Sequence, residues 1–188
     1  MSIKRFRQED LPVINGKKVR LRPISHADTA DIVRWRNDPK VQKFFIFREP
    51  FTPQMHENWL DTKVAAGKVI QYMILDKATK QSVGSVYLKD VDMQHLSAEY
   101  GIFIGESAAR GRGLGSETAK LFTDFAFEKL GLHRISLRLL SGNRAAMRSY
   151  ERAGFEVEGI FKDMVRLEGE FTDIIFMARI NGEEQDEK

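Results

Sequence analysis

The stretch Arg110-Gly111-Arg112-Gly113-Leu114-Gly115 lies between an apolar run that is typical of a strand and a longer amphipathic run that is typical of a helix. Glycines allow main-chain N–H groups to approach a ligand closely because they carry no side chain. The N-terminus of a helix leaves several N–H groups unpaired and favours negative charge. This stretch therefore predicts a binding site for a phosphate or pyrophosphate group.

The elements around this turn follow from hydrophobic periodicity and from residues that cap helices or form turns. Before the turn, the sequence predicts strands at 18–22, 71–75, 83–88 and 97–104, a helix at 25–36, and a helix from Pro53 with the apolar stripe Met55, Trp59, Leu60 and Val64. After the turn, it predicts a helix at 113–130, a strand at 134–140, a helix at 143–153, and a hairpin of strands at 155–166 and 171–180. This order predicts an α+β domain built on one sheet.

The composition is that of an ordinary globular protein. The chain has 188 residues, so we expect residues 1–188 to form a single domain, with a polar and disordered tail at 181–188. The absence of cysteine excludes a disulfide framework, a thiolate zinc site and a cysteine nucleophile, and it fits a cytoplasmic protein. Met1–Asp10 lacks the apolar core of a signal peptide, and no apolar run is long enough to span a membrane. The four histidines have no metal-ligand spacing, so we predict no metal site.

The net charge is only +3, but arginines gather in and after the turn, at Arg110, Arg112, Arg134, Arg138, Arg144, Arg148 and Arg152. They favour either a local field that attracts a polyphosphate or ordinary solvated faces of helices and strands. A nucleic-acid partner is not expected, because no basic tract is interleaved with aromatic residues.

Two other phosphate-binding turns can be tested against this sequence. A P-loop has Lys-Ser or Lys-Thr after its last glycine, whereas Gly115 is followed by Ser116 and Glu117. A Rossmann site has an acidic residue at the end of the next strand, whereas that strand ends with Leu139-Leu140-Ser141. Both patterns are excluded, which leaves a plain turn without a ligand and a third kind of phosphate-binding loop.

The spacing Arg110-x-x-Gly113-x-Gly115 resembles the coenzyme A pyrophosphate loop of the GNAT acyltransferase superfamily, Arg/Gln-x-x-Gly-x-Gly/Ala. Gly101-Ile102-Phe103-Ile104 stands where that family has the strand whose splayed backbone bonds the pantetheine arm. Asn143 opens the helix after the next strand, and Tyr150-Glu151-Arg152-Ala153-Gly154-Phe155 resembles the family's Tyr-x-x-x-Gly-Phe ending. The resemblance covers residues 97–158. It implies a GNAT-like fold, with one mixed central sheet flanked by helices, and transfer of an acetyl group from acetyl-CoA to an amine in a ternary complex.

The resemblance also implies roles for individual residues. Tyr150 would donate a proton to the leaving sulfur, and Glu99 would act as the general base; the plainer alternatives are a core tyrosine and a salt-bridged or exposed glutamate. Glu158 and Asp173 are possible substitutes for Glu99. The residues expected to bind the cofactor are Ile102, Phe103, Ile104, Arg110, Gly111, Arg112, Gly113, Leu114, Gly115, Ser116, Asn143 and Arg152.

The N-terminal half is expected to choose the acceptor. Its residues resemble two GNAT branches, which acetylate the N-termini of ribosomal proteins and nucleotide-linked amino sugars; the expected substrate-binding residues are Arg36, Asn37, His56 and Trp59. The plainer expectation is that Trp59 packs in the core while His56 is exposed. We expect an anionic acceptor such as a nucleotide-linked amino sugar, because this half is rich in arginine and lysine. The alternatives are a peptide N-terminus or a polyamine, although polyamine sites prefer acidic residues.

Two further questions stay open at this point. The chain could bind coenzyme A without turnover, or it could bind RNA, which would make its affinity fall steeply with salt. The apolar run Ile174-Ile175-Phe176-Met177 fits either the core or the seam of a homodimer.

Overall fold

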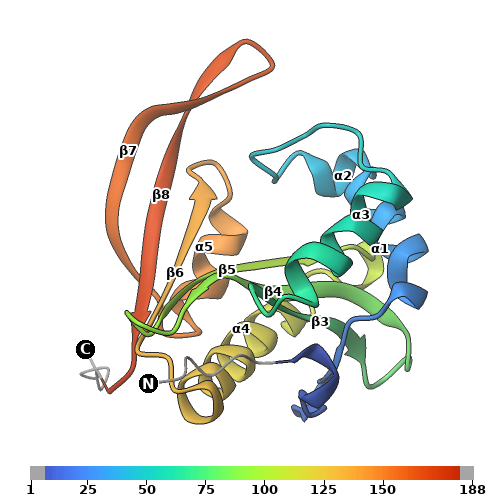
Figure 1. Cartoon of the computed structure of the whole chain (residues 1–188). Coiled ribbons are helices and arrows are strands. Elements are labelled where there is room, and N and C mark those ends of the chain that lie inside the picture. The colour runs from blue at the N-terminus through green and yellow to red at the C-terminus, as the bar shows by residue number, and fades with distance from the viewer. Residues whose placement is uncertain (1–6, 183–188) are drawn as a thin grey trace.

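The computed structural model describes residues 7–182, which contain one mixed eight-stranded sheet with the order β1-β2-β3-β4-β5-β6-β8-β7 (Figure 1). Neighbouring strands are antiparallel except for β5 and β6, which are parallel. The strands are β1 Ile14–Asn15, β2 Val19–Pro23, β3 Val69–Asp76, β4 Ser82–Asp92, β5 Ser97–Ile104, β6 Arg134–Leu140, β7 Glu156–Leu167 and β8 Glu170–Ile180. The prediction of an α+β fold on one mixed sheet is confirmed.

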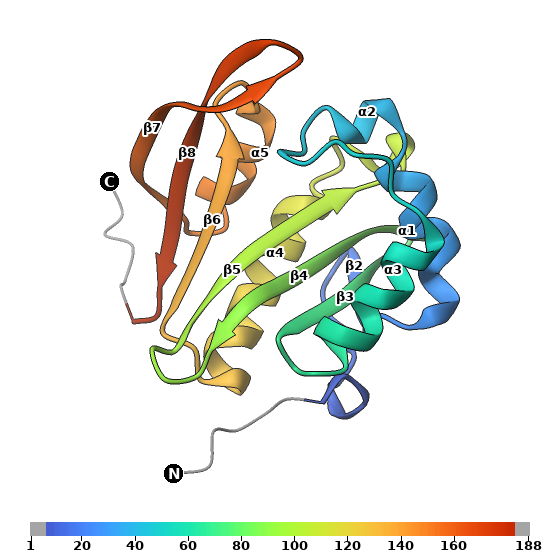
Figure 2. The same ribbon diagram turned by 45° about the horizontal axis from the view of Figure 1, so that its top comes forward.

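The helices cover both faces of this sheet, with α1 and α3 on one face and α4 and α5 on the other (Figures 1 and 2). They are α1 Thr29–Arg36, α2 Pro39–Gln42, α3 Pro53–Trp59, α4 Leu114–Phe125 and α5 Arg144–Glu151. A π-helical turn continues α3 through Leu60–Val64, and another continues α4 through Ala126–Leu130. Gly131, with φ of 75°, ends the second of these helices as expected.

Two apolar clusters lie on the two faces because successive residues of a strand point to opposite sides. Tyr72 and Tyr100 belong to the larger cluster with Phe122 of α4. Met73 and Phe103 belong to the smaller cluster, together with Trp35, Leu60 and Val64. The larger cluster fixes the helix that follows the glycine turn, and the smaller one fixes the N-terminal helices.

Cap residues define the helix ends largely as the sequence predicts. Ser25 forms a capping box with Asp28 ahead of α1, and the Thr52 hydroxyl accepts the amide of Met55 at 3.2 Å. The predicted apolar stripe of α3 is wrong at one position: Met55 is 46% exposed, and His56 is buried in its place. Asp38-Pro39 ends α1 as expected but also begins the unpredicted α2, because proline is favoured at the first helical position.

The sheet opens between its two parallel strands. Pairing between β5 and β6 is limited to Ser97 with Arg134, Ala98 with Ile135, and Glu99 with Ser136. Beyond these pairs β5 continues along β4, and β6 continues along β8. The two strands diverge (Figure 2), so one edge of the β5 main chain from Tyr100 to Ile104 pairs with no strand of residues 7–182. This edge is available to a ligand.

The C-terminal hairpin β7–β8 carries the apolar run from Ile174 to Met177. Ile174, Ile175 and Met177 are buried in the protein, and the Phe176 ring lies 4.2 Å from that of Phe161. The run therefore belongs to the core, and a homodimer stays a prediction. Within the predicted tail, the amide of Asn181 donates to the carbonyl of His133 at 2.8 Å; residues 183–188 lie outside the described part of the chain. Of the helices in residues 7–182, none is long and apolar enough to cross a bilayer.

Candidate active site

The glycine turn joins the open edge of β5 to α4. Gly111 and Gly113 have φ of 76° and 81°, a left-handed conformation that side chains disfavour. Gly115 already lies inside α4, and a Cβ added there would meet the Ser149 hydroxyl at an ordinary 3.7 Å. The backbone therefore favours glycine at positions 111 and 113, whereas at position 115 glycine leaves the surface of α4 without a side chain. Leu114, which is fully buried, anchors the first turn of the helix.

The two arginine side chains of the turn are occupied by protein acceptors. Arg110 donates to the carbonyls of Ile104 and Gly105, each at 3.1 Å. Arg112 forms an ion pair with the buried Asp76, and this contact holds the pKa of Asp76 below its usual range. These side chains stabilise the turn itself. We therefore expect the main-chain N–H groups at the N-terminus of α4 to bind the pyrophosphate.

Lys18 lies beside the turn and was not anticipated from the sequence. Its Nζ donates to the carbonyl of Arg112 at 3.2 Å, and the Glu117 carboxylate accepts the amide of Lys18 at 2.8 Å. These contacts fasten the start of β2 to the first turn of α4. Lys18 thereby adds a positive charge next to Gly113, from a segment 94 residues earlier in the chain.

The remaining predicted cofactor residues divide into two groups. Ile102, Phe103 and Ile104 pair with β4 alone and form the free edge of β5. On the other face, the Ser116 hydroxyl lies 2.9 Å from that of Ser149, which joins α4 to α5. Asn143 caps α5 through its Oδ1, which accepts the amide of Ala146 at 3.2 Å. Its side-chain amide makes no hydrogen bond within residues 7–182 and is available to a ligand.

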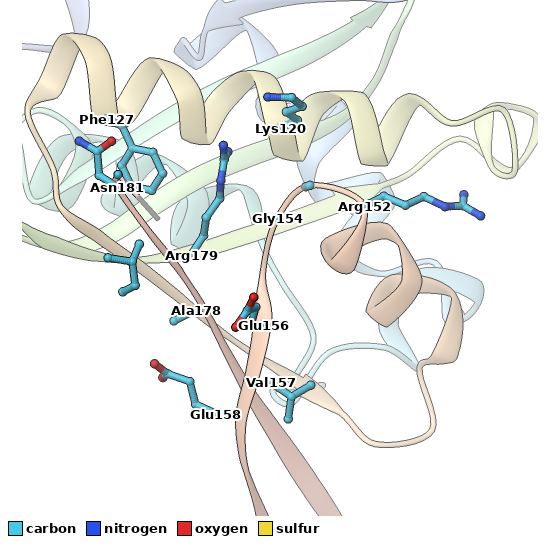
Figure 3. A pocket seen from close by; sticks show the side chains of 13 residues that line it. Lys120, Phe127, Arg152, Gly154, Glu156, Val157, Glu158, Ala178, Arg179 and Asn181 are labelled. Atoms are coloured by element: carbon cyan, nitrogen blue, oxygen red, sulfur yellow. The ribbon is translucent and has the colours of Figure 1, made fainter. Parts of the chain in front are cut away.

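A cavity of about 380 Å³ lies elsewhere, between α4, the end of α5 and the strands β7 and β8. Figure 3 shows Glu156, Arg179, Lys120 and Arg152 among the residues that line this cavity. Arg152 is exposed and makes no side-chain hydrogen bond within the described residues. Of the predicted cofactor-binding residues, only Arg152 is among those that line this cavity.

Tyr150 lies on α5, at the inner face of the sheet. Its side chain is 8% exposed, and its ring lies 6.0 Å from Tyr100 and 5.9 Å from Phe155. Burial raises the pKa of Tyr150 well above its usual value, with a smaller contribution from Tyr87. The phenol is therefore protonated at neutral pH and is able to donate a hydrogen bond or a proton.

Glu99 lies at the last pair between β5 and β6, where the sheet begins to open. Lys89 Nζ is 3.1 Å from its carboxylate, and the Arg138 guanidinium is 3.0 Å away. The structure thus has the salt-bridged glutamate that was the plainer alternative, and the role of general base stays a prediction. The two substitutes are paired as well, Glu158 with Arg134 and Asp173 with Lys162.

Of the four expected substrate-binding residues, Asn37 and Trp59 use their polar side-chain atoms in hydrogen bonds within the protein. The Asn37 amide forms two hydrogen bonds with the main chain of Phe51, at 2.7 and 2.8 Å. Trp59 donates from its indole nitrogen to Gln71 at 2.9 Å and is half-buried. The expectation of an exposed His56 is wrong, because its side chain is 1% exposed and turns inward beside Thr29.

Among residues 7–182, two buried side-chain nitrogens have no hydrogen-bond partner, namely Nε of Arg36 and Nε2 of His56. The other ring nitrogen of His56 lies 2.9 Å from the Thr29 hydroxyl. Burial lowers the pKa of His56 to about 4. The imidazole is therefore neutral at physiological pH.

This buried imidazole predicts a loss of stability in weak acid. An unfolded histidine takes up a proton near pH 6.5, whereas His56 does so only near pH 4, so the unfolded state binds more protons between these values. We expect the free energy of unfolding to fall by about 2 kcal/mol between pH 7.5 and pH 5 because of this residue. Urea unfolding at the two pH values measures it; His56→Gln should remove most of the loss, and the exposed His133→Gln should retain it.

Comparison with known proteins extends these observations. Residues 18–156 match the family model described as an acetyltransferase (GNAT) domain. The chain is 23% identical to the probable N-acetyltransferase YjcK of Bacillus subtilis, over 92% of this chain and 99% of the relative. It is 26% identical to the spermidine N(1)-acetyltransferase of Escherichia coli K12, over 87% of each chain.

The fold is also found among solved structures. The crystal structure of the Vibrio cholerae spermidine N-acetyltransferase in complex with CoA and spermine has a TM-score of 0.80 and 24% identity, and the match covers 88% of this chain and 96% of that one. The family model spans the glycine turn, the open edge of β5, and Asn143 and Tyr150 of the site. The chain therefore belongs to the GNAT acetyltransferase family.

Proposed function

We propose that this acetyl-CoA-dependent N-acetyltransferase acts on the primary amine of a small molecule, by direct attack within a ternary complex. The observation that carries the proposal is the free edge of β5 beyond Glu99, which runs from the opening of the sheet towards the left-handed glycine turn. The main chain there has unpaired groups for an extended amide-bearing arm, and the turn leads into the N-terminus of α4.

Acetyl-CoA supplies an acetyl group that is already activated as a thioester, so orientation can provide much of the rate enhancement. The N–H groups of β5 are available to align the arm and to stabilise negative charge on the reacting carbonyl oxygen. Tyr150 holds a phenolic proton close to the opening and donates it to the departing sulfur. Position 101 has no room for a side chain, because a Cβ added to Gly101 would lie 2.3 Å from the Tyr87 ring.

Glu99 is the acid closest in sequence to the opening, and its proposed task is to take the amine proton, directly or through water. We expect Glu99→Gln to lower kcat/KM about 100-fold at every pH at which the wild type is active. The measurement is a pH–rate profile from pH 6 to 9.5, and Glu158→Gln, which removes an alternative base, is measured alongside. An unchanged profile in Glu99→Gln would leave the carboxylate as the partner of Lys89 and Arg138 alone.

Two candidates remain for the acceptor, a polyamine and a peptide N-terminus. The spermidine acetyltransferase relatives favour a polyamine. The reported relatives give no support to the nucleotide-linked amino sugar expected from the sequence. A peptide N-terminus remains the further alternative.

The function is tested by measuring thiol release from acetyl-CoA across polyamines, amino acids, amino sugars and peptides with free N-termini, together with calorimetric titration of acetyl-CoA. We expect binding of acetyl-CoA and thiol release with at least one small amine. Binding without thiol release on any amine would support the non-catalytic coenzyme A module instead. A lack of binding by folded protein would overturn both proposals.

A further inference from the structure

Arg36 is a cation held between two aromatic rings. Its guanidinium lies 4.8 Å from the centroid of Phe45 and 4.5 Å from that of Phe51. Its Nε is buried without a hydrogen-bond partner, and the side chain as a whole remains partly exposed. Within residues 7–182, no carboxylate forms an ion pair with it. Stacking on rings offsets part of the desolvation of a cation but does not supply an acceptor for its N–H groups.

The neighbouring arginines are paired, which sets Arg36 apart. Arg34, two residues earlier on α1, contacts Asp31 at 2.8 Å and Glu106 at 2.7 Å. Arg48 contacts Glu168 at 2.5 Å. Residues 29–51 contain five basic and only three acidic residues, so this segment offers few carboxylates to a polycation. Burial lowers the pKa of Arg36, as expected for a cation that lacks a counter-ion.

The surroundings of Arg36 are fixed in place. The Asn37 side chain holds the main chain of Phe51, because its amide nitrogen donates to the Phe51 carbonyl and its amide oxygen accepts the Phe51 N–H. Arg48 Nε donates to the carbonyl of Phe45 at 3.1 Å. A guanidinium whose stacking partners are held in this way loses little further freedom when it binds a ligand. The aromatic clamp of Phe45 and Phe51 therefore preorganises Arg36.

The clamp adjoins the reaction centre. The Phe45 ring lies 5.6 Å from Phe103, which belongs to the free edge of β5. Arg36 and Tyr87 are close enough for each to affect the pKa of the other, and Tyr87 lies against Gly101 at the opening of the sheet. On the other side of the clamp, the Phe51 ring is 6.2 Å from His56, whose Nε2 is a second buried nitrogen without a partner. Two unsatisfied nitrogens thus flank one ring near the proposed site of transfer.

We propose that Arg36 binds a carboxylate or phosphate group of the acceptor, so that the enzyme selects a small amine that also carries an anion. The proposal rests on the proposed function of this site. A planar guanidinium with free N–H groups binds either anion through paired hydrogen bonds. A polyamine has no such group, and the Arg36 charge would repel it. Asp31, Glu106 and Glu168 are engaged by Arg34 and Arg48, which leaves fewer carboxylates for a polyamine in this part of the protein.

The experiment compares matched acceptors in the acetyl-CoA thiol-release assay: glucosamine 6-phosphate with glucosamine, leucine with leucinamide, and spermidine alone. We expect the wild-type kcat/KM to be at least about tenfold higher for an anionic member than for its neutral partner. Arg36→Gln should lower kcat/KM for the anionic member by about 10- to 100-fold, the usual range for a lost hydrogen bond to a charged group. The neutral partner and the KM for acetyl-CoA should change by less than about twofold.

Two control variants separate this result from a general loss of structure. Arg20→Gln removes an exposed arginine on β2 and should preserve the preference, and Arg36→Lys should retain part of it through its charge. If Arg36→Gln fails to fold, Arg36→Lys and the wild-type comparison decide. Equal rates for both members of every pair, spermidine as the best acceptor, or an unchanged preference in Arg36→Gln would each overturn the proposal.

The failure of the proposed function has a different signature, because no amine would then release thiol. In that event calorimetry on protein saturated with coenzyme A tests Arg36 directly. Binding of glucosamine 6-phosphate at least about tenfold tighter than that of glucosamine, and its loss in Arg36→Gln, would support the anion site without catalysis. Equal affinities would overturn it.

Discussion

Tyr150→Phe is expected to lower kcat at least about 100-fold while it leaves the KM for acetyl-CoA within about twofold. The ring is buried against Tyr100 and Phe155, so phenylalanine fills the same space and removes only the hydroxyl. The high pKa of this phenol keeps its proton in place at neutral pH, which suits a group that donates to a departing thiolate. Steady-state kinetics with acetyl-CoA and the best acceptor of the panel measures both constants.

Tyr100→Phe is the matched control for this prediction. Tyr100 lies on β5 in the same cluster, and its buried hydroxyl has no hydrogen-bond partner in the described part of the chain. Removal of that hydroxyl should leave kcat within about threefold and should preserve or slightly raise the thermal stability, since no hydrogen bond is lost. Wild-type turnover in Tyr150→Phe, or an equal loss in both variants, would refute the role of Tyr150 as the proton donor.

Gly113→Ala is expected to weaken acetyl-CoA binding about 10- to 100-fold and to lower the free energy of unfolding by about 1–2 kcal/mol. With φ of 81°, an alanine here is strained or forces the turn into another conformation. A different conformation would redirect the main-chain N–H groups at the start of α4, where we expect the pyrophosphate to bind. Calorimetry gives the affinity, and urea unfolding gives the stability.

Two glycines elsewhere in the chain separate these effects. Gly131 has φ of 75° and open space around it at the far end of the same helix, so Gly131→Ala should cost similar stability and leave acetyl-CoA affinity unchanged. Gly115 is helical, so Gly115→Ala should fold normally and affect binding only through the methyl group. If Gly113→Ala and Gly131→Ala bound acetyl-CoA equally well, the turn would not be the pyrophosphate site.

Local sequence signals were sufficient for most of the elements. The spans predicted for β5 and β6 agree with the structure, because alternation and β-branched residues identify a strand without reference to its neighbours. Ser25, Thr52, Asn143 and Gly131 mark helix ends through contacts within a few residues. The predicted apolar stripe of α3 was wrong at Met55 because it was chosen by hydrophobicity alone. His56 is buried instead, through a contact with the distant residue Thr29 rather than through apolar character.

The sequence by itself determined the resemblance to the GNAT family, the glycine turn ahead of a helix, and the placement of Asn143 and Tyr150 on the helix after the next strand, since each is recorded in a short continuous segment. Only the tertiary structure decided which side chains are free to act. It pairs Glu99 with Lys89 and Arg138, engages Arg110, Arg112 and Asn37 with the protein itself, brings Lys18 to the turn, and leaves Arg36 without a counter-ion. The physical reason is that ion pairs and burial depend on distances between segments far apart in the chain, and no local pattern records those distances.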